Sequence, residues 1–493
     1  MRLPVFKWEV LLTDLLSNRM NLTKQEINKL NDSGISESTI QKQFLKLVNG
    51  PANLDLKRAC VIGDGIEKIS VADFDTYQSI YQKGVLKNVI SIFTPASGAA
   101  TRMFKHLLNP ESNPDLYGAF IKNLERFAFF HEMERMNKSS IEEKVQFILN
   151  PEGLNYAKLP KALISFHKYG NEVLKAIDEQ LVEGIAYINS DSKCRFHFTI
   201  SPEHENLIKT HLAPIIKALE VTHEIEILVE YSFQESYTDT IALQPNGELV
   251  RDEMGELLLR PGGHGSLIYN LNGMESNIVF IKNIDNIARK ELHPRVIQYK
   301  RIIGGYLMDI QTRVFDILRE LEVEVSANRL EDMVALFERN WNLKLPSSQD
   351  ELILALNKPI RVCGMVKNEG KAGGGPFWVG DTPQIVESAQ MNTSLPEVKD
   401  MLVKASHFNP VDLVCGIKNY KDEKFNLLDF TDDQSFFVSE KSYLGQEIKV
   451  LEHPGLWNGA MANWLTFFIE VPVVTFNPVK TVNDLLLPSH CDL

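Results

Sequence analysis

The sequence has few cysteines and no long apolar run, and both absences narrow the class of protein. Its five cysteines are scattered over 493 residues and form no CxxC pair or Cys/His spacing that would hold zinc. We therefore expect a reducing cytoplasmic setting. No stretch approaches the ~18 apolar residues of a membrane span, and Lys7, Glu9 and Asp14 interrupt the N-terminal apolar stretch too early for a signal peptide. The sequence thus predicts a cytoplasmic protein without a membrane partner.

Positive charge is also in short supply. There are 52 Lys and Arg residues against 65 Asp and Glu residues, which gives a formal net charge of -13. Such a chain repels polyanions, which disfavours nucleic acid and anionic membranes as partners. Hydrophobic residues make up 44% and charged residues 24% of the chain, as in ordinary soluble globular proteins. Any anionic substrate therefore needs a local cluster of Lys, Arg and backbone N–H groups.

The chain exceeds the ~250–300 residues at which a single core stops growing, so additions to one large domain are expected. We predict an N-terminal helical extension over 1–85, whose first nineteen residues are poorly ordered, and a main domain over 86–493. Amphipathic patterns without strand signals predict a helical insertion in the main domain at about 107–158.

The main domain alternates between strand and helix patterns. The apolar run 88–93 predicts a buried strand before a helix from about Thr101. Further patterns predict a helix at 171–188, a strand at 195–200, a helix at 202–219 and strands at 225–231 and 277–281, then a helix at 290–322 with a kink at Gly304-Gly305. Strands are also expected near 359–366, 377–379, 385–389, 411–417 and 468–475. This order predicts an α/β fold with a mostly parallel sheet.

Four segments carry candidate chemistry, and each has a plain structural alternative. Small residues at 96–101 followed by Arg102 suit a phosphate loop or merely a tightly packed turn. The glycines around His264 suit contact with a flat base or a simple turn. Asp285, after the strand at 277–281, suits Mg²⁺ or a helix cap. Lys480, in the segment 476–487, is by default a solvated charge.

Together these segments resemble the UDP-sugar pyrophosphorylases, of the nucleotide-diphospho-sugar transferase superfamily. Those enzymes carry a glycine-rich loop ending in Thr-Arg, a Pro-Lys pair, an aromatic-Gln segment, a GGHG turn, an NxDN strand end and a late PVKTxxDLL segment. This chain has, in the same order, Ala100-Thr101-Arg102-Met103, Pro160-Lys161, Phe233-Gln234, Gly262-Gly263-His264-Gly265, Asn283-Ile284-Asp285-Asn286 and the segment 478–487. More narrowly, it is similar to a bacterial family related to these enzymes.

The resemblance implies a Rossmann-like three-layer α/β/α sandwich with a mixed, mostly parallel sheet, and Mg²⁺-dependent transfer of a uridylyl group from UTP to a sugar 1-phosphate. Arg102, Lys161 and Lys480 would be catalytic, and Asp285 would hold Mg²⁺. The nucleotide would be bound by Ala96, Ser97, Gly98, Ala99, Ala100, Thr101, Gln234, Gly262, Gly263, His264 and Gly265.

For the sugar, the resemblance points to Glu387 and Asn409. The glycine-rich segment from Gly364 to Trp378 predicts a flexible loop over a hexose, with Trp378 as the stacking face; a surface loop and a core tryptophan are the alternatives.

The phosphate loop departs from the family pattern. It reads Ser97-Gly98-Ala99-Ala100 where the family has more glycine, and each added side chain narrows the approach of the backbone to a ligand. The second hypothesis is therefore a non-catalytic sugar-nucleotide sensor that keeps the pocket without turnover. A kinase-like phosphotransferase ranks third, because the chain has no GxxxxGK[ST] motif.

Overall fold

A ten-stranded mixed sheet forms the centre of the molecule. The computed structural model describes residues 20, 22–136, 139–370 and 374–492. The strand order is β2-β3-β19-β12-β16-β11-β4-β7-β8, and β15 pairs with β12 outside this path. Within the path every pair is parallel except those of β16, which runs antiparallel to β12 and to β11. The predicted mixed α/β fold with a mostly parallel sheet is confirmed.

The strands of this sheet are short and largely apolar. All five residues of β11 and five of the six residues of β4 are buried, as expected for strands covered on both faces. The ten strands are β2 (Val61–Ile62), β3 (Gly65–Glu67), β4 (Ile90–Pro95), β7 (Lys193–Thr199), β8 (Glu226–Ser232), β11 (Ile278–Lys282), β12 (Ile360–Lys367), β15 (His407–Phe408), β16 (Asp412–Gly416) and β19 (Leu465–Glu470).

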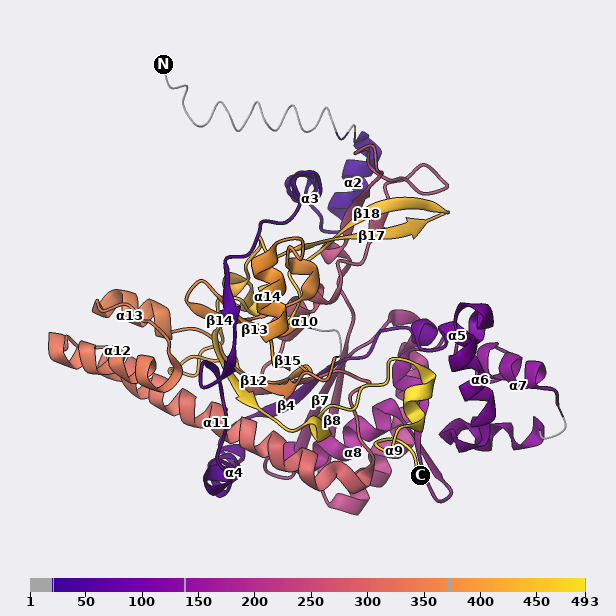
Figure 1. Cartoon of the computed structure of the whole chain (residues 1–493), viewed down its shortest axis with the longest axis horizontal. Helices are drawn as coiled ribbons and strands as arrows, with labels where there is room; N and C mark the ends of the chain where they lie inside the picture. Colours follow the sequence, from indigo (N-terminus) through magenta and orange to yellow (C-terminus); the bar gives the residue numbers. More distant parts are fainter. Residues whose placement is uncertain (1–19, 21, 137–138, 371–373, 493) are drawn as a thin grey trace.

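Helices pack against this sheet, and the longest of them crosses below it in Figure 1. The predicted helix at 171–188 starts later, because 172–175 pairs with the preceding strand in a hairpin. The elements are the hairpin β5 (Ser165–Tyr169) and β6 (Glu172–Lys175), and the helices α4 (Phe74–Val85), α8 (Ala176–Ile188), α9 (Glu205–His223), α10 (Leu267–Asn272), α11 (His293–Glu320), α12 (Ala327–Trp341), α13 (Gln349–Leu356) and α14 (Pro396–Lys404).

The paired glycines in α11 serve helix packing. A Cβ at Gly305 would lie 1.9 Å from the carbonyl oxygen of Tyr77 in α4, and one at Gly304 would lie 2.4 Å from the Tyr81 ring. Helix α11 runs uninterrupted through both positions, over 28 residues. The glycines that suggested a kink therefore let two helices approach closely.

The N-terminal part contains strands as well as helices, which corrects its description as helical. Helices α2 (Lys24–Asp32) and α3 (Glu37–Asn49) begin at the capping residues Thr23 and Ser36. Strand β1 (Leu56–Ala59) follows and pairs with β13, and β3 joins the central sheet beside β19. The sequence signal was weak because these strands are only two to four residues long. The first nineteen residues lie outside the described ranges, and the domain division stays a prediction.

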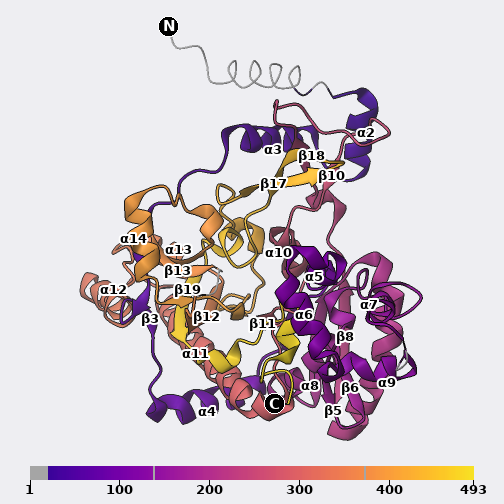
Figure 2. The same cartoon turned by 45° about the vertical axis from the view of Figure 1, so that its right-hand side comes forward.

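Two smaller sheets complete the fold. One has the order β10-β9-β18-β17 and lies with α2 and α3 at the top of both cartoon views (Figures 1 and 2). The other has the order β1-β13-β14. Their strands are β9 (Thr240–Leu243), β10 (Leu259–Arg260), β13 (Gly375–Val379), β14 (Thr382–Val386), β17 (Phe437–Tyr443) and β18 (Gln446–Glu452). Within the described ranges, every helix is too short or too polar to cross a bilayer.

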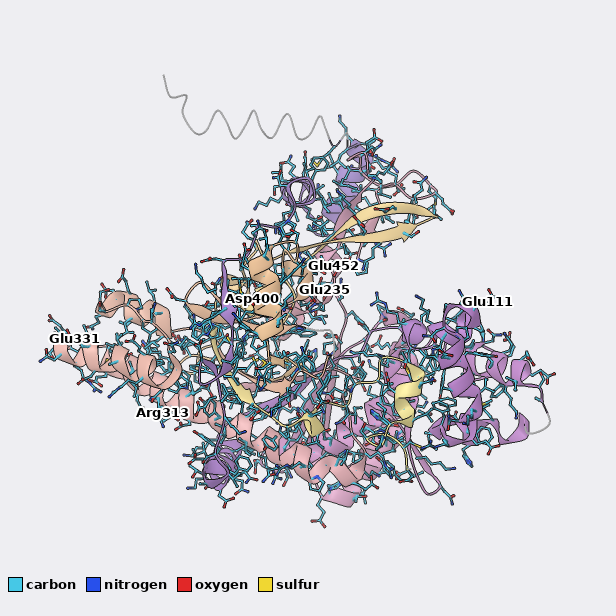
Figure 3. All side chains as sticks on the ribbon, viewed as in Figure 1. Glu111, Glu235, Arg313, Glu331, Asp400 and Glu452 are labelled. Carbon is cyan, nitrogen blue, oxygen red and sulfur yellow. The ribbon has the colours of Figure 1, made fainter. Side chains whose placement is uncertain are left out.

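The predicted insertion at 107–158 is helical, and its described residues contain no strand. It holds α6 (Pro114–Lys122), α7 (Ile141–Leu149) and the 3₁₀ helices Pro110–Ser112, Leu124–Arg126 and Ala128–Met136, after the short helix α5 (Lys105–Leu108). Phe127 stacks on Phe129 and lies at a tilt against Phe120, which gives the insertion an aromatic core. In Figure 3, Glu111 of this insertion lies at the opposite end of the molecule from Glu331 of α12.

Candidate active site

Two lysines from distant parts of the chain meet one aspartate at an end of β11. The Nζ atom of Lys161 lies 2.8 Å from Asp285 Oδ2, and that of Lys480 lies 3.4 Å from the same oxygen. Lys161 also donates to the carbonyl oxygen of Val479, at 2.9 Å. The side chains are 16% exposed for Lys161, 7% for Asp285 and 65% for Lys480. We call these three residues the lysine–aspartate cluster; it carries one more positive than negative charge.

Backbone contacts hold Asp285 and Lys480 together. The N–H of Val479 donates to the carbonyl oxygen of Asp285 at 3.2 Å, and Asn286 forms a β-bridge with Pro478. The Asn286 side chain accepts from the N–H of Asn477 at 2.7 Å. Two of the motifs predicted from the sequence, at 283–286 and 478–487, are therefore joined side by side. Asp285 lies three residues beyond the end of β11, outside the paired strand.

The predicted phosphate loop is attached to the Pro160-Lys161 pair. Lys161 N–H donates to the Gly98 carbonyl and Ala100 N–H to the Leu159 carbonyl, both at 3.0 Å. In the part of the chain that the structure describes, the N–H groups of Ser97, Gly98 and Ala99 donate to no protein acceptor. All three residues are exposed. Three adjacent donors are thus available to an anion beside Lys161.

The helix expected from Thr101 is replaced by a single 3₁₀ turn, Ala100–Arg102, and α5 begins only at Lys105. A turn this short offers no substantial helix dipole, so any phosphate contact would rest on the loop N–H groups and the lysines. Thr101 bonds the Ala157 carbonyl with its hydroxyl. Arg102 is exposed and has no ion pair among the described residues. It therefore follows the loop directly in sequence but forms no ion pair with the lysine–aspartate cluster.

The glycine turn at 262–265 packs against the turn at 453–457. A Cβ at Gly262 would lie 2.3 Å from the His453 ring, and one at Gly265 would lie 2.2 Å from the Pro454 carbonyl oxygen. Gly263 has a φ of +77°. Close packing and a left-handed backbone therefore account for these three glycines. Gln234 lies partly buried, and its Nε2 has no hydrogen-bond partner.

His264 connects this turn to a predicted sugar-binding residue. Its ring stacks on Trp457, with centroids 4.4 Å apart, and its Nδ1 accepts from the N–H of Leu456. Since Nδ1 is an acceptor, the neutral ring carries its proton on Nε2. That nitrogen lies 3.6 Å from Glu387 Oε1. Residues predicted separately for the base and for the sugar thus face each other.

A cavity of about 300 Å³ lies between Glu387 and Lys480. Asn409 and the Trp457 ring also line it, together with Asn283, the residue that follows β11. Asn409 donates to the carbonyl oxygen of Gly364 at 3.3 Å, so Gly364 supports this wall through its backbone. A carboxylate, two amides, an aromatic face and a lysine give the mixture of polar and flat groups that suits a sugar phosphate.

The expectation that Trp378 offers a stacking face is wrong. Trp378 lies in β13, is 2% exposed, and is covered by the Arg58 guanidinium at 4.7 Å from its ring. Gly364 lies inside β12 and Gly375 begins β13, so the expected loop spans less of the chain; Gly373 lies outside the described residues. Trp457, which follows Pro454 and Gly455 in a turn, lines the cavity instead and was not predicted from the sequence. Its only signal was an aromatic residue beside turn-forming ones.

Comparison with families shows that the chain belongs to the family described as "Domain of unknown function (DUF4301)", which matches residues 23–491. No curated protein matches the chain. Similar solved structures include a UDP-glucose phosphorylase from Trypanosoma brucei, with 14% identity, 94% of this chain and 77% of that chain covered, and a TM-score of 0.46. A variant of UDP-glucose pyrophosphorylase from Leishmania major, solved with UDP-glucose, has 13% identity, the coverage of 94% and 77%, and a TM-score of 0.46. A uridine diphosphate N-acetylglucosamine pyrophosphorylase from Trypanosoma brucei has 11% identity, coverage of 97% and 83%, and a TM-score of 0.48.

Proposed function

We propose that the chain is a nucleotidyltransferase that makes a UDP-sugar and pyrophosphate from UTP and a sugar 1-phosphate. The observation that carries this proposal is the lysine–aspartate cluster, in which two ammonium groups share one carboxylate beside the free N–H groups of 97–99. An excess of positive charge next to unpaired donors suits a polyphosphate. The order of motifs that resembles the UDP-sugar pyrophosphorylases supports the same proposal, and a Rossmann-like three-layer α/β/α sandwich is part of what we propose.

In the proposed reaction, a phosphate oxygen of the sugar 1-phosphate attacks the α-phosphorus of UTP. The bond from that phosphorus to the bridging oxygen breaks, and pyrophosphate leaves with the electron pair. No protein nucleophile is required, so the chain contributes positioning and charge stabilisation. Lys161, held by Asp285 and the Val479 carbonyl, would meet charge at the α-phosphate, while the more exposed Lys480 would meet the incoming sugar phosphate.

Asp285 also suits magnesium. Both lysines approach Oδ2, and no donor among the described residues reaches Oδ1. The described residues contain no group of three His, Cys, Asp or Glu side chains that would hold a metal on their own. One carboxylate completed by water and substrate phosphates is a usual arrangement for Mg²⁺. A bound Mg²⁺ would supply charge neutralisation on the phosphates, and Asp285 would hold it.

We assign the sugar to the cavity beside Lys480. Glu387 and Asn409 would bind hydroxyl groups, and Trp457, in place of Trp378, would offer the ring face. His264, Gln234 and the glycine turn would contact uracil. Arg102 keeps its proposed role on the triphosphate, and its exposure leaves it able to turn toward the loop.

The second candidate is a sugar-nucleotide sensor without turnover. It is favoured by the alanines and serine in the phosphate loop and by the separation of Arg102 from the lysine–aspartate cluster. The test is release of pyrophosphate from UTP and Mg²⁺ with a panel of sugar 1-phosphates, alongside a thermal-shift panel of nucleotides and UDP-sugars. Release with at least one sugar supports the enzyme. Stabilisation by UDP-sugars without release supports the sensor, and neither response contradicts both.

A further inference from the structure

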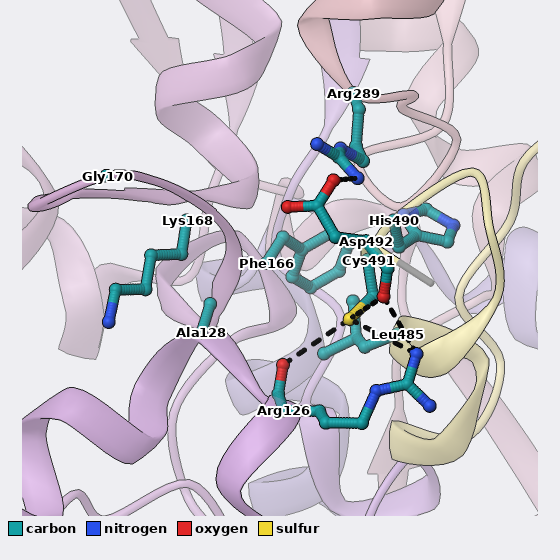
Figure 4. A pocket seen from close by; sticks show the side chains of 10 residues that line it. All are labelled: Arg126, Ala128, Phe166, Lys168, Gly170, Arg289, Leu485, His490, Cys491 and Asp492. Carbon is teal, nitrogen blue, oxygen red and sulfur yellow. Dashed lines mark hydrogen bonds and ion pairs between the residues drawn. The ribbon is translucent and has the colours of Figure 1, made fainter.

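A second basic cavity lies away from the lysine–aspartate cluster. Its volume is about 730 Å³, and it opens between the β5–β6 hairpin, the insertion and the C-terminal segment (Figure 4). Three cations line it: Arg126 from the insertion, Lys168 from β5 and Arg289 from the segment that follows Asp285. In a chain with a net charge of -13, three cations around one cavity are a local concentration of positive charge. Arg126 and Arg289 approach Asp492, whereas the Lys168 ammonium points away from them (Figure 4).

These cations are incompletely neutralised. Within the described ranges, neither Arg126 nor Lys168 forms an ion pair with a carboxylate. Arg289 pairs through Nε with Glu291, at 3.1 Å, and Glu291 is 60% exposed. The cavity therefore retains the capacity to hold a further anion.

An acidic residue of the chain itself already lies in this cavity. Asp492 places Oδ1 2.5 Å from Arg289 Nη1, and its carbonyl oxygen accepts from Arg126 Nη2 at 2.8 Å (Figure 4). The Asp492 side chain is 83% exposed, whereas that of Arg289 is 13% exposed. Exposed ion pairs contribute little, so a ligand with more negative charge can displace the aspartate while the arginine stays in place.

We propose that this cavity is a separate anion site, which binds a phosphoryl dianion in exchange for the Asp492 carboxylate. The forked guanidinium groups of Arg126 and Arg289 suit phosphate oxygens, which they can contact in pairs. Free inorganic phosphate and the phosphoryl group of an organic phosphomonoester share this chemistry. The site does not depend on uridylyl transfer.

The walls of this anion site continue into the segments that carry the lysine–aspartate cluster. Arg289 N–H donates to the Ser489 carbonyl at 3.1 Å, which ties the segment after Asp285 to the C-terminal segment. Asp484 accepts from the N–H groups of Lys480 and Thr481, at 2.8 and 2.7 Å. Arg289 and Asp492 therefore lie on the same two segments of the chain that carry Asp285 and Lys480.

The test is titration of the full chain by calorimetry, with inorganic phosphate in one arm and phenyl phosphate in the other, at constant ionic strength. The protein carries Lys480→Ala, so that binding at the cluster is weakened. We expect Arg289→Gln and Arg126→Gln each to weaken binding about fivefold, the size of one partly exposed ion pair. Asp492→Asn should tighten binding by a similar factor, because it removes the competing carboxylate. Arg295→Gln, at an arginine that bonds Gln298 and lies over Tyr299, is the matched control and should change nothing.

The arginine variants should weaken binding and the aspartate variant should tighten it, and a general folding defect would not produce both changes. If Arg289→Gln does not fold, by circular dichroism and urea midpoint, the exposed positions Arg126 and Asp492 decide the outcome. Unchanged or weaker binding in Asp492→Asn would overturn the proposal, as would phosphate binding that vanishes in Lys480→Ala alone. Tighter binding of phenyl phosphate than of inorganic phosphate assigns the site to organic phosphomonoesters, and the reverse order assigns it to the free ion.

Discussion

Two groups of lysines and carboxylates lie at neighbouring positions along β11, and they are built differently. Lys282 of β11 pairs with Glu183 of α8, Lys300 of α11 pairs with Asp412 of β16, and all four side chains are at most 2% exposed. We call these four residues the buried quartet. Just beyond the strand, the lysine–aspartate cluster has two lysines for one carboxylate, and Lys480 is 65% exposed. The quartet is matched in charge and closed; the cluster is unmatched and open.

Lysine and carboxylate side chains therefore have two different roles here, one structural and one in binding. Burial alone would raise the pKa of Glu183, but the ammonium groups of Lys282 and Lys300 outweigh it and hold this pKa below its usual value. Such a pair satisfies itself and has no charge left for a ligand. At Asp285, by contrast, one of the two lysines has no carboxylate to neutralise it. For this reason we assign the cluster, and not the quartet, to an anionic substrate.

The largest effect is expected from breaking the quartet. Lys282→Met leaves Glu183 buried without its partner and should lower the free energy of unfolding by about 3–5 kcal/mol. Urea denaturation measures this loss. The double variant Lys282→Met/Glu183→Leu should recover most of it, because no uncompensated charge remains. A single-variant loss below about 1 kcal/mol would mean that the quartet is not a structural unit.

Removing a cation from the open cluster should instead reduce turnover. We expect Lys480→Ala to lower kcat about 100-fold, the usual cost of one donor to a transition-state charge. Stability should change by no more than about 0.5 kcal/mol, since the side chain is largely exposed. Initial rates over a range of UTP concentrations separate the cases. A rise in KM with unchanged kcat would make Lys480 a ground-state contact.

A smaller effect is expected from the two tryptophans. Trp457→Leu should raise KM for the sugar 1-phosphate about tenfold, and that for UTP by less, because the lost ring face contributes about 1–1.5 kcal/mol. Trp378→Phe is the matched control at a buried position: it should lower the thermal midpoint and leave both KM values unchanged. Equal shifts in both KM values for Trp457→Leu would assign this ring to the base.

The effect that is smallest at any one pH step concerns three buried, hydrogen-bonded side chains without a matched ion pair. His167 bonds Glu179 at 2.7 Å and His490 at 2.9 Å. Burial lowers the pKa of His167 and of His490 to about 3, and raises the pKa of Glu179 to about 7. The neutral histidines stabilise the fold above the unfolded-state pKa of about 6.5, and this contribution is lost as pH falls. Glu179 acts oppositely, because its contribution is lost as pH rises toward 7.

From pH 6.5 down to 4.5 the two histidines outweigh the one carboxyl. Their combined effect therefore lowers the free energy of unfolding by about 1.4 kcal/mol for each pH unit. Urea unfolding at several pH values would show it. In His167→Gln/His490→Gln only the Glu179 term remains, so the sign should reverse and this contribution should rise by about 1.4 kcal/mol for each pH unit as pH falls over the same range. An unchanged slope would show that these histidines are not neutral in the folded state.

Much of this arrangement was predictable from local patterns. The apolar runs of β4 and β11 gave the strands, and the residues after them gave the loop at 96–102 and Asp285. The partner of Asp285 was not predictable by periodicity, because Lys161 lies 124 residues away in the chain. The burial of the tryptophans was likewise not predictable from local patterns. Trp378 is buried because β1 pairs with β13. These two segments are far apart in the chain, and neither sequence indicates that the other is its partner.

We infer that Asp285 organises a reaction centre and is not part of a second structural ion pair. The most direct measurement compares wild type with Asp285→Asn for pyrophosphate release from UTP, Mg²⁺ and an accepted sugar 1-phosphate, with urea unfolding of both proteins. We predict that the variant loses turnover by more than about 100-fold while losing less stability than Lys282→Met. Turnover close to that of wild type in a folded variant would show that Asp285 does not organise a reaction centre.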